Sequence, residues 1–381
     1  MRILYYCQHV LGVGHFHRSL EICRACSEAH QVTMIVGGPD ISVGNEPFDF
    51  LKLPGLQMDD EFSGLKSCDP RLGLEEVKRM RIETLLSFFK STLPDCLILE
   101  LYPFGRKAFR FELTPLLETA RAESTLVLCS LRDILVEKKT DRSMWEDRVV
   151  ATLNNYFDGV LVHADPQLVT LDNTFGPIDL VDAPIYYTGF ITPKPQLNAR
   201  SKIRATLGLG PDDALIVASI GSGSVGAHLL EAIATAARSE LIPPTFHFHL
   251  FTGPYCPPSV VKKLHATAGQ NLVVEQFTDH FINWLAAADL SVSMAGYNTS
   301  MNTLAAGVPA LMLPFDQNRE QLLRVERLIA EHPIDIVDLV DLDPERLAGL
   351  IVSQARKSRC QTQLDLDGAR RTVSTIERLD R

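Results

Sequence analysis

The residues best suited to chemistry concentrate in a segment that begins SVSMAGYNTS at Ser291. A short apolar strand ends at Gly296, and a helix opens with Tyr297, Asn298 and Thr299. The first amides of a helix have no partner inside the helix and lie at the positive end of its dipole, so they favour an anion. We therefore predict a diphosphate site at Gly296 and the three residues that follow it.

Three further residues of the same segment suit a nucleotide and a sugar. Asn302 lies one helical turn after the diphosphate residues and is placed to reach a ribose hydroxyl. After the next strand, PFDQNREQ places Glu320 and Gln321 where a sugar joined to the diphosphate would lie. Each residue alone could belong to an ordinary solvated helix cap, but their combination in one strand, helix, strand, helix unit favours a ligand site.

A glycine-rich turn, SIGSGSVG, precedes this segment and also joins a strand to a helix. Its backbone amides and hydroxyl groups suit a phosphate or a sugar ring. The alternative is an ordinary strand-to-helix turn, because such turns favour Gly and Ser in any case. The candidate binding residues here are Gly221, Ser222, Gly223 and Ser224.

A second glycine-rich turn, GVGHFHR, follows the first strand of the chain. Gly12 and Gly14 permit a tight turn, and His15 at the helix entrance could take a proton from a sugar hydroxyl or from water. Arg18 could bind a phosphate or a carboxylate, or pair with a nearby acid. The alternative for His15 is a capping or packing role. His17 occupies the third glycine position of a dinucleotide fingerprint, which argues against a dehydrogenase.

Two acidic residues follow apolar strands of the same half of the chain. Glu100 ends the strand predicted over 96–101, and Asp133 follows the strand predicted over 125–131. In a parallel sheet both carboxylates lie at the carboxyl edge, where they could orient His15 or bind a second substrate. The alternative is ion pairing with neighbouring basic residues, namely Arg106, Lys107 and Arg132.

The elements that position these residues alternate between short apolar strands and amphipathic helices along the whole chain. Such strands are buried on both faces, which predicts an α/β protein with parallel sheets. We expect two Rossmann-like doubly wound domains that face a central cleft. The predicted parts are a first domain over 1–190, a linker over 191–212, a second domain over 213–356, and a helix within 357–381 that packs back on the first domain.

Composition narrows the function classes. The 381 residues are 46% hydrophobic and carry a formal net charge of −10, which suits two globular domains and argues against a nucleic-acid binder. The eight Cys lie mostly in apolar segments, so we expect reduced, packed thiols. The sequence starts directly on a predicted strand and holds no long apolar run, so we expect a cytoplasmic protein with at most peripheral membrane contact.

The donor segment and the strand pattern together resemble the GT-B glycosyltransferases related to the bacterial enzyme that adds N-acetylglucosamine to the lipid-linked peptidoglycan precursor. The chain looks closest to a poorly characterised bacterial group with segments like ELYPFGRK and SLRDILVEK, which here contain Glu100 and Ser130. The resemblance implies inversion at the sugar without a metal or other cofactor. It also implies that Phe277 lies near the base and that Glu320 and Gln321 contact the sugar. Asn302 stands where those enzymes carry a ribose-binding glutamate.

The turn GVGHFHR resembles the GxGHxxR turn of a nucleotide-sugar hydrolase of pseudaminic acid biosynthesis. In that family the histidine is catalytic, which implies a catalytic role for His15. A histidine in this turn can activate water as readily as an alcohol, so transferases and hydrolases share this sequence signature.

Our sequence-based hypothesis is an inverting, metal-independent glycosyltransferase. It would move a sugar from a nucleoside diphosphate sugar, such as UDP-N-acetylglucosamine, to an unknown acceptor that is a small molecule or is lipid-linked. One alternative is a nucleotide-sugar hydrolase or 2-epimerase of the same fold. A second alternative is a nucleotide-sugar-binding subunit without catalysis.

Overall fold

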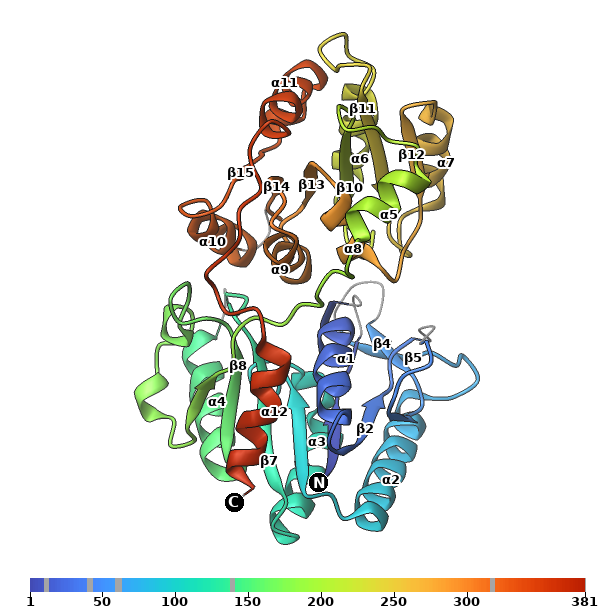
Figure 1. Ribbon diagram of the computed structural model, residues 1–381. Coiled ribbons are helices and arrows are strands. Elements are labelled where there is room, and N and C mark those ends of the chain that lie inside the picture. Colours follow the sequence, from blue (N-terminus) through green and yellow to red (C-terminus); the bar gives the residue numbers. More distant parts are fainter. Residues whose placement is uncertain (10–13, 40–43, 59–63, 138–140, 316–318, 381) are drawn as a thin grey trace. The chain divides into compact units, whose positions relative to one another are not determined.

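The chain divides into two compact units in a computed structural model (Figure 1) that describes residues 1–380 except 10–13, 40–43, 59–63, 138–140 and 316–318. The first unit consists of Met1–Ile191 together with Leu364–Arg381, and the second consists of Thr192–Gln363. Gly12 lies outside the described residues.

The first unit is built on a seven-stranded sheet with the order β3-β2-β1-β6-β7-β8-β9, in which every neighbouring pair is parallel. The order reverses between β1 and β6, which makes this position the topological switch point of the sheet. Its strands are β1 (Arg2–Tyr6), β2 (Gln31–Val36), β3 (Asp49–Lys52), β6 (Cys96–Glu100), β7 (Leu126–Arg132), β8 (Gly159–His163) and β9 (Ile185–Tyr187), beside a small antiparallel pair, β4 (Leu56–Met58) and β5 (Leu65–Ser67).

Helices cover both faces of this sheet because neighbouring side chains of a strand point to opposite faces. Tyr5 lies in the apolar cluster that includes Ile22 and Ile376, whereas Tyr6 on the other face reaches Glu112. The helices are α1 (Gly14–Ser27), α2 (Leu74–Thr92), α3 (Arg110–Ala122), α4 (Arg142–Tyr156) and α12 (Gly368–Leu379), with short 3-10 turns η1 (Lys107–Phe109), η2 (Leu171–Asn173) and η3 (Ile178–Leu180).

The second unit repeats the design with a six-stranded parallel sheet of order β12-β11-β10-β13-β14-β15. Its switch point lies between β10 and β13. The strands are β10 (Ala214–Ser219), β11 (Phe246–Phe251), β12 (Leu272–Glu275), β13 (Leu290–Met294), β14 (Ala310–Leu313) and β15 (Ile334–Ile336). The helices are α5 (Ala199–Thr206), α6 (Ala227–Ala236), α7 (Pro258–Thr267), α8 (Phe281–Ala287), α9 (Tyr297–Ala306), α10 (Arg319–Leu328) and α11 (Pro344–Gln354), with the 3-10 turn η4 (Val340–Leu342).

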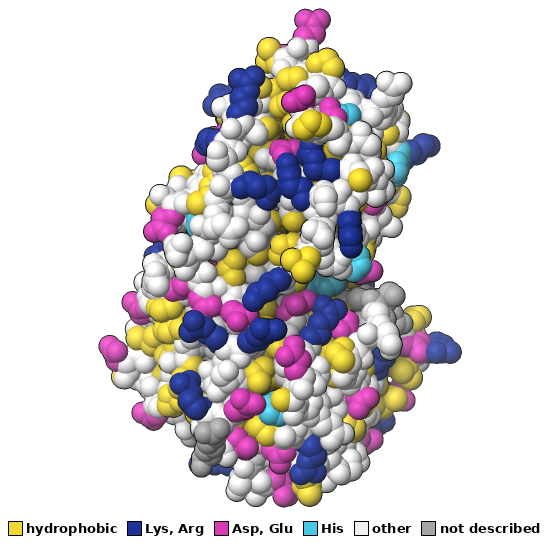
Figure 2. Space-filling model, in the orientation of Figure 1, with side chains coloured by type: hydrophobic (Ala, Val, Ile, Leu, Met, Phe, Trp, Pro, Cys, Tyr) yellow, Lys and Arg dark blue, Asp and Glu magenta, His cyan; other side chains and the backbone are white. Residues whose placement is uncertain are grey.

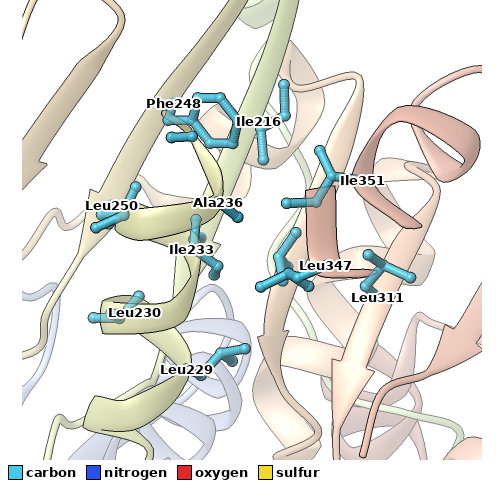
Figure 3. Packing of buried hydrophobic residues seen from close by; sticks show 14 of the residues in the cluster. Ile216, Leu229, Leu230, Ile233, Ala236, Phe248, Leu250, Leu311, Leu347 and Ile351 are labelled. Atoms are coloured by element: carbon cyan, nitrogen blue, oxygen red, sulfur yellow. The ribbon is translucent and has the colours of Figure 1, made fainter. Parts of the chain in front are cut away.

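The core of the second unit forms where α6 and α11 pack against the sheet (Figure 3). Ile233 of α6 and Leu347 and Ile351 of α11 are fully buried and lie against Ile216 of β10 and Leu311 of β14. Their helical spacing presents one apolar face of each helix to the strands. This packing fixes the sheet whose switch-point edge carries the predicted donor residues.

The predicted α/β class with two doubly wound parallel sheets is confirmed. The segment 191–212, predicted as a linker, contains α5, whose Arg204 bonds to Asp289 at 2.8 Å within the second unit. The first helix begins at Gly14, so His15, which was expected at the helix entrance, lies in its first turn. The chain returns to the first unit at Leu364, seven residues later than the predicted start at 357.

The surface shows no dominance of one charge on the visible face, where acidic and basic side chains are intermixed (Figure 2). Within the part of the chain that the structure describes, no helix is both long enough and apolar enough to cross a bilayer.

Helix α12 closes the face of the first sheet beside α1, and Ile376 is its fully buried anchor. We expect Ile376→Ala to lower the free energy of unfolding by about 2–5 kcal/mol, because it deletes buried methyl groups and leaves a cavity. Urea unfolding monitored by circular dichroism measures this change. The control Ser374→Ala, on the exposed side of α12, should stay within about 0.5 kcal/mol, and equal effects of both variants would contradict this packing role.

Candidate functional site

Some of the predicted site residues of each unit lie at the switch point of its sheet. In the first unit α1 follows β1, and Glu100 ends β6, the neighbour of β1. In the second unit the turn after β10 and the start of α9 after β13 also follow neighbouring strands, since Ser219 pairs with Ser293. The carboxyl edge beside a switch point is where doubly wound folds bind ligands.

The first-unit cluster is centred on the carboxylate of Glu100, which is fully buried. One oxygen lies 2.5 Å from Nδ1 of His15 and accepts from Nη2 of Arg18 at 2.8 Å. The other oxygen accepts from Nη2 of Arg106 at 2.8 Å. Glu100 therefore contacts His15 and also pairs with Arg106, so the orienting contact and the ion pair that were posed as alternatives occur together. Asp133 is also fully buried, directly after β7.

The contacts at Nδ1 of His15 decide which ring nitrogen carries the proton. Arg18 Nη2 lies 3.1 Å from Nδ1, but a guanidinium can only donate and it already donates to Glu100. The carboxylate of Glu100 can only accept, so the 2.5 Å contact requires a proton on Nδ1. In the neutral ring Nε2 then carries the lone pair, which makes it the basic atom.

Charge and burial around the cluster keep His15 neutral near pH 7. Burial lowers the pKa of His15 to about 4, against the opposing effect of Glu100 and with a further lowering by Arg106 and Arg18. Burial alone would raise the pKa of the Glu100 carboxyl, but His15, Arg106 and Arg18 together hold it well below its usual range. The pair is thus a neutral imidazole on a carboxylate, which is the arrangement of an oriented general base.

A chain of buried polar groups crosses the sheet beside Glu100. Tyr5 Oη lies 2.8 Å from Ser130 Oγ, which lies 2.7 Å from Nε2 of His163. His163 Nδ1 lies 2.8 Å from Thr188 Oγ1. Burial and the charge of Arg18 lower the pKa of His163 to about 3, so this ring is neutral as well. These hydrogen bonds join β1, β7 and β8 to Thr188, the residue after β9, and Ser130 also pairs with Glu100 in the sheet.

The glycine-rich turn of the second unit depends on backbone conformations that favour glycine. Gly221, Gly223 and Gly226 have φ of 66°, 91° and 90°, in the left-handed region. A side chain at Gly223 would place its Cβ 2.5 Å from the carbonyl oxygen of Thr252. Ser222 and Ser224 direct their hydroxyl groups toward each other, with the oxygens 3.4 Å apart. The conformation of this turn therefore requires its glycines, and the turn follows β10, the neighbour of the strand that precedes α9.

Helix α9 begins at Tyr297 directly after Gly296, as the sequence predicts, and binding of a diphosphate there stays a prediction. Gly296 caps the helix in an extended conformation, and its carbonyl accepts from the amide of Ser300 at 2.9 Å. A Cβ placed on Gly296 would meet no described atom within 4 Å, so packing does not require this glycine. Asn298 and Thr299 are half-buried on the first turn, whereas the ring of Tyr297 is buried. Tyr297 can thus contribute its backbone to a ligand and not its ring.

A buried arginine that sequence reasoning missed supports this helix start. Arg324 is fully buried and bonds to Glu320 at 2.9 Å and to the carbonyl of Ala295 at 3.3 Å. Its guanidinium carbon lies 5.5 Å from the centre of the Tyr297 ring, within range of a cation–π contact. Arg324 therefore links α10 to the turn at Gly296. The stretch REQLLRVERL reads as a charged surface helix, so nothing in its sequence pattern signals this buried role.

The remaining donor residues lie in the second unit with their polar atoms already engaged. Asn302 Oδ1 accepts from Thr192 Oγ1 at 2.7 Å. The Glu320 carboxylate turns inward to Arg324, and Gln321 Oε1 accepts from the amide of Phe315 at 3.0 Å. Phe277 follows β12 and is 47% exposed. Contacts of these residues with a sugar, a ribose or a base stay predictions.

The sequence of the second unit matches a known family. Residues 217–363 match the family model described as the Glycosyltransferase family 28 C-terminal domain. A Vibrio cholerae serotype O1 protein named UDP-N-acetylglucosamine--N-acetylmuramyl-(pentapeptide) pyrophosphoryl-undecaprenol N-acetylglucosamine transferase is 31% identical over 117 residues, covering 28% of this chain and 33% of the relative. A Histophilus somni protein of the same name is 26% identical over 188 residues, covering 48% and 50%. The chain thus spans a third to a half of these curated relatives.

Solved structures share the fold over the whole chain. The MurG structure of Acinetobacter baumannii has a TM-score of 0.57 at 15% identity, and the match covers 99% of this chain and 99% of that one. The forosaminyltransferase SpnP has a TM-score of 0.60 at 14% identity, covering 100% of this chain and 99% of that one. The HepE protein of Anabaena, solved with UDP and glucose, has a TM-score of 0.55 at 14% identity, covering 100% and 97%. These likenesses show the GT-B fold predicted from the sequence.

The geometry predicts how His15 titrates. We expect its imidazole to be neutral at pH 7 and to protonate at about pH 4, as followed by NMR of labelled histidine with His15→Asn for assignment. In Arg106→Met the pKa of His15 should rise, because a positive charge that disfavours the imidazolium is removed. The control Arg110→Met, on the exposed start of α3, should leave it unchanged. An ordinary value near 6.5 in the unaltered protein would contradict the buried cluster.

Proposed function

From the family 28 C-terminal domain that residues 217–363 form, we propose that this chain is an inverting glycosyltransferase that uses a nucleoside diphosphate sugar. The names of its relatives favour UDP-N-acetylglucosamine as the donor and a lipid-linked or small-molecule acceptor. We include in this proposal that transfer needs no metal and takes place in the cytoplasm. The observation that carries the proposal is the contact of His15 with the buried carboxylate of Glu100, in a chain whose second unit holds the glycine-rich turn after β10 and the helix start at Gly296.

The second unit would hold the donor. The start of α9 would place its dipole and amides against the diphosphate, with the side chains of Asn298 and Thr299 beside it. The glycine-rich turn from Gly221 to Ser224 would approach the same ligand, because β10 and β13 are neighbours. Fixed donors of this kind stabilise the charge that develops on the departing diphosphate without rearranging during the reaction.

The first unit would supply the base. Nε2 of His15 accepts the proton of the acceptor hydroxyl while the oxygen forms a bond to C1 of the sugar. The bond between C1 and the diphosphate oxygen breaks, and its electron pair leaves with the nucleotide. Glu100 accepts a hydrogen bond from the N–H group at Nδ1 and stabilises the imidazolium that forms. Attack from the face opposite the leaving group inverts C1.

Donor binding is tested by substituting a glycine of the turn. Gly223→Ala should weaken binding of UDP-N-acetylglucosamine at least about tenfold, because an added Cβ would lie 2.5 Å from the Thr252 carbonyl at a φ of 91° and force the turn to move. Isothermal calorimetry measures this affinity. The matched control Gly349→Ala, in helix α11 with open space around it, should bind as the unaltered chain does. Failure of the unaltered protein to bind any nucleotide sugar would refute the proposed donor.

The base is tested by His15→Gln, which keeps a donor for Glu100 and removes the lone pair of Nε2. We expect turnover to fall by about 10²–10⁴-fold with donor affinity unchanged. The assay follows UDP release from UDP-N-acetylglucosamine with a panel of alcohols and without acceptor, and His17→Gln is the control. Because the base works only when neutral and its pKa is about 4, the rate should be level from pH 5 to 7 and fall as the pH drops below about 4.

The same assay separates transfer from its alternatives. Fast UDP release in the absence of any alcohol would identify a hydrolase or epimerase, in which His15 activates water. Donor binding without any turnover, unaffected by His15→Gln, would identify a binding subunit instead.

A further inference from the structure

A cavity of about 340 Å³ lies within the first unit, at the carboxyl ends of β1, β2 and β3. Its volume is in the lower part of the range of small-molecule sites. It is on the same edge of the sheet as His15, because Phe16 lines it and is the next residue of α1. The lining residues that matter for its chemistry are His9, Phe16, Gly37, Phe50, Lys52 and Asp69.

Buried hydrogen bonds hold one wall of the cavity in place. Arg81 is fully buried and forms two bonds to the carboxylate of Glu112, at 2.6 and 2.7 Å. Its third nitrogen donates to the carbonyls of Gly37 at 2.9 Å and Pro54 at 2.7 Å. A Cβ on Gly37 would lie 2.2 Å from that nitrogen, so the wall depends on glycine. A wall fixed in this way needs little ordering when a ligand binds.

Aromatic rings supply the apolar surface. Phe16 is buried and meets the ring of His9 edge-on, with centroids 5.4 Å apart. Phe50 packs on Phe48 with centroids 5.2 Å apart. His9 bonds to the carbonyl of Pro39 at 2.8 Å, and burial lowers its pKa, so it adds no positive charge at pH 7. The walls therefore suit a flat apolar group.

Lys52 supplies the charge. It ends β3, is exposed and lines the cavity. Among the described residues no carboxylate lies within ion-pair distance of Lys52, and the lining acid Asp69 pairs with Arg71 at 2.6 Å. Because Asp69 is neutralised in this way, the cavity presents a positive charge next to an aromatic wall, which favours an anion.

We propose that this cavity binds the acceptor, and that the acceptor is a small molecule with a flat apolar ring and a phosphate or carboxylate group. The ring lies against Phe16 and Phe50, and the anion pairs with Lys52. This inference rests on the proposed function, because it assigns the cavity to the substrate whose hydroxyl His15 deprotonates. The adjacency of Phe16 and His15 on α1 brings the two sites to one edge of the first sheet.

The test is calorimetric binding of 4-hydroxyphenyl phosphate and 4-hydroxybenzoate, with hydroquinone as their neutral counterpart. We expect both anions to bind at millimolar concentration or below and hydroquinone to bind at least tenfold more weakly. Lys52→Met should weaken the anions about tenfold, and Lys52→Arg should retain them because it keeps the charge. Lys90→Met, an exposed lysine of α2 outside the cavity, is the matched control and should bind as the unaltered chain does. The anion that binds more tightly identifies the acceptor group as phosphate or carboxylate.

Two results would overturn the inference, namely no preference for the anions over hydroquinone, or equal binding by Lys52→Met and the unaltered protein. Donor affinity, measured on the same samples with UDP-N-acetylglucosamine, separates this failure from failure of the proposed function. If the donor binds normally but the anions show no preference or no dependence on Lys52, only the assignment of the acceptor to this cavity is refuted. Anion binding through Lys52 without donor binding refutes the transferase and the acceptor role together.

Discussion

The first unit is organised around a buried carboxylate whose negative charge must be balanced by neighbouring groups. Glu100 is removed from solvent at the end of β6, and an uncompensated charge there would cost several kcal/mol. Arg18 from α1, Arg106 from the segment after β6, and His15 supply the compensation. These partners tie α1 to the central strands at the switch point. The same constraint that stabilises this edge of the sheet therefore orients the imidazole.

Buried arginines play the corresponding part in the second unit and beside the cavity. Arg324 joins α10 to the residue before Gly296, and Arg81 joins α2 and α3 to the carbonyl of Gly37. In each case a guanidinium bonds to a buried glutamate and to a backbone carbonyl of a functional turn. A planar group with five donors can satisfy both at once, which an ammonium cannot do with the same geometry. The backbone at Gly37 and at Ala295 is thereby held in place by hydrogen bonds from buried arginines.

The sequence predicted the order of strands and helices well, because parallel strands are short apolar runs with a clear period. It also offered Glu100 and Asp133 as acids that could orient His15, and in the structure Glu100 makes this contact because β6 is the neighbour of β1. It did not predict Arg324, because burial of a charged residue depends on its partners in space and leaves no mark on local periodicity. The sequence also showed no clear sign that the helix starts at Gly14. Gly is a poor helix former, and it is as common in loops as at the first position of a helix.

The balance of charges around His15 decides whether the cluster can act as a base. Glu100 favours the imidazolium, whereas burial and two arginines disfavour it, and the net result is a pKa of about 4. Burial makes the largest contribution to this lowering, whereas Glu100 acts in the opposite direction by favouring the protonated ring. The arginines neutralise Glu100 without competing for Nε2, because Arg18 and Arg106 donate to the carboxylate oxygens. Burial and the two arginines therefore act together to keep the imidazole neutral beside Glu100, so that Nε2 of the proposed base can accept a proton.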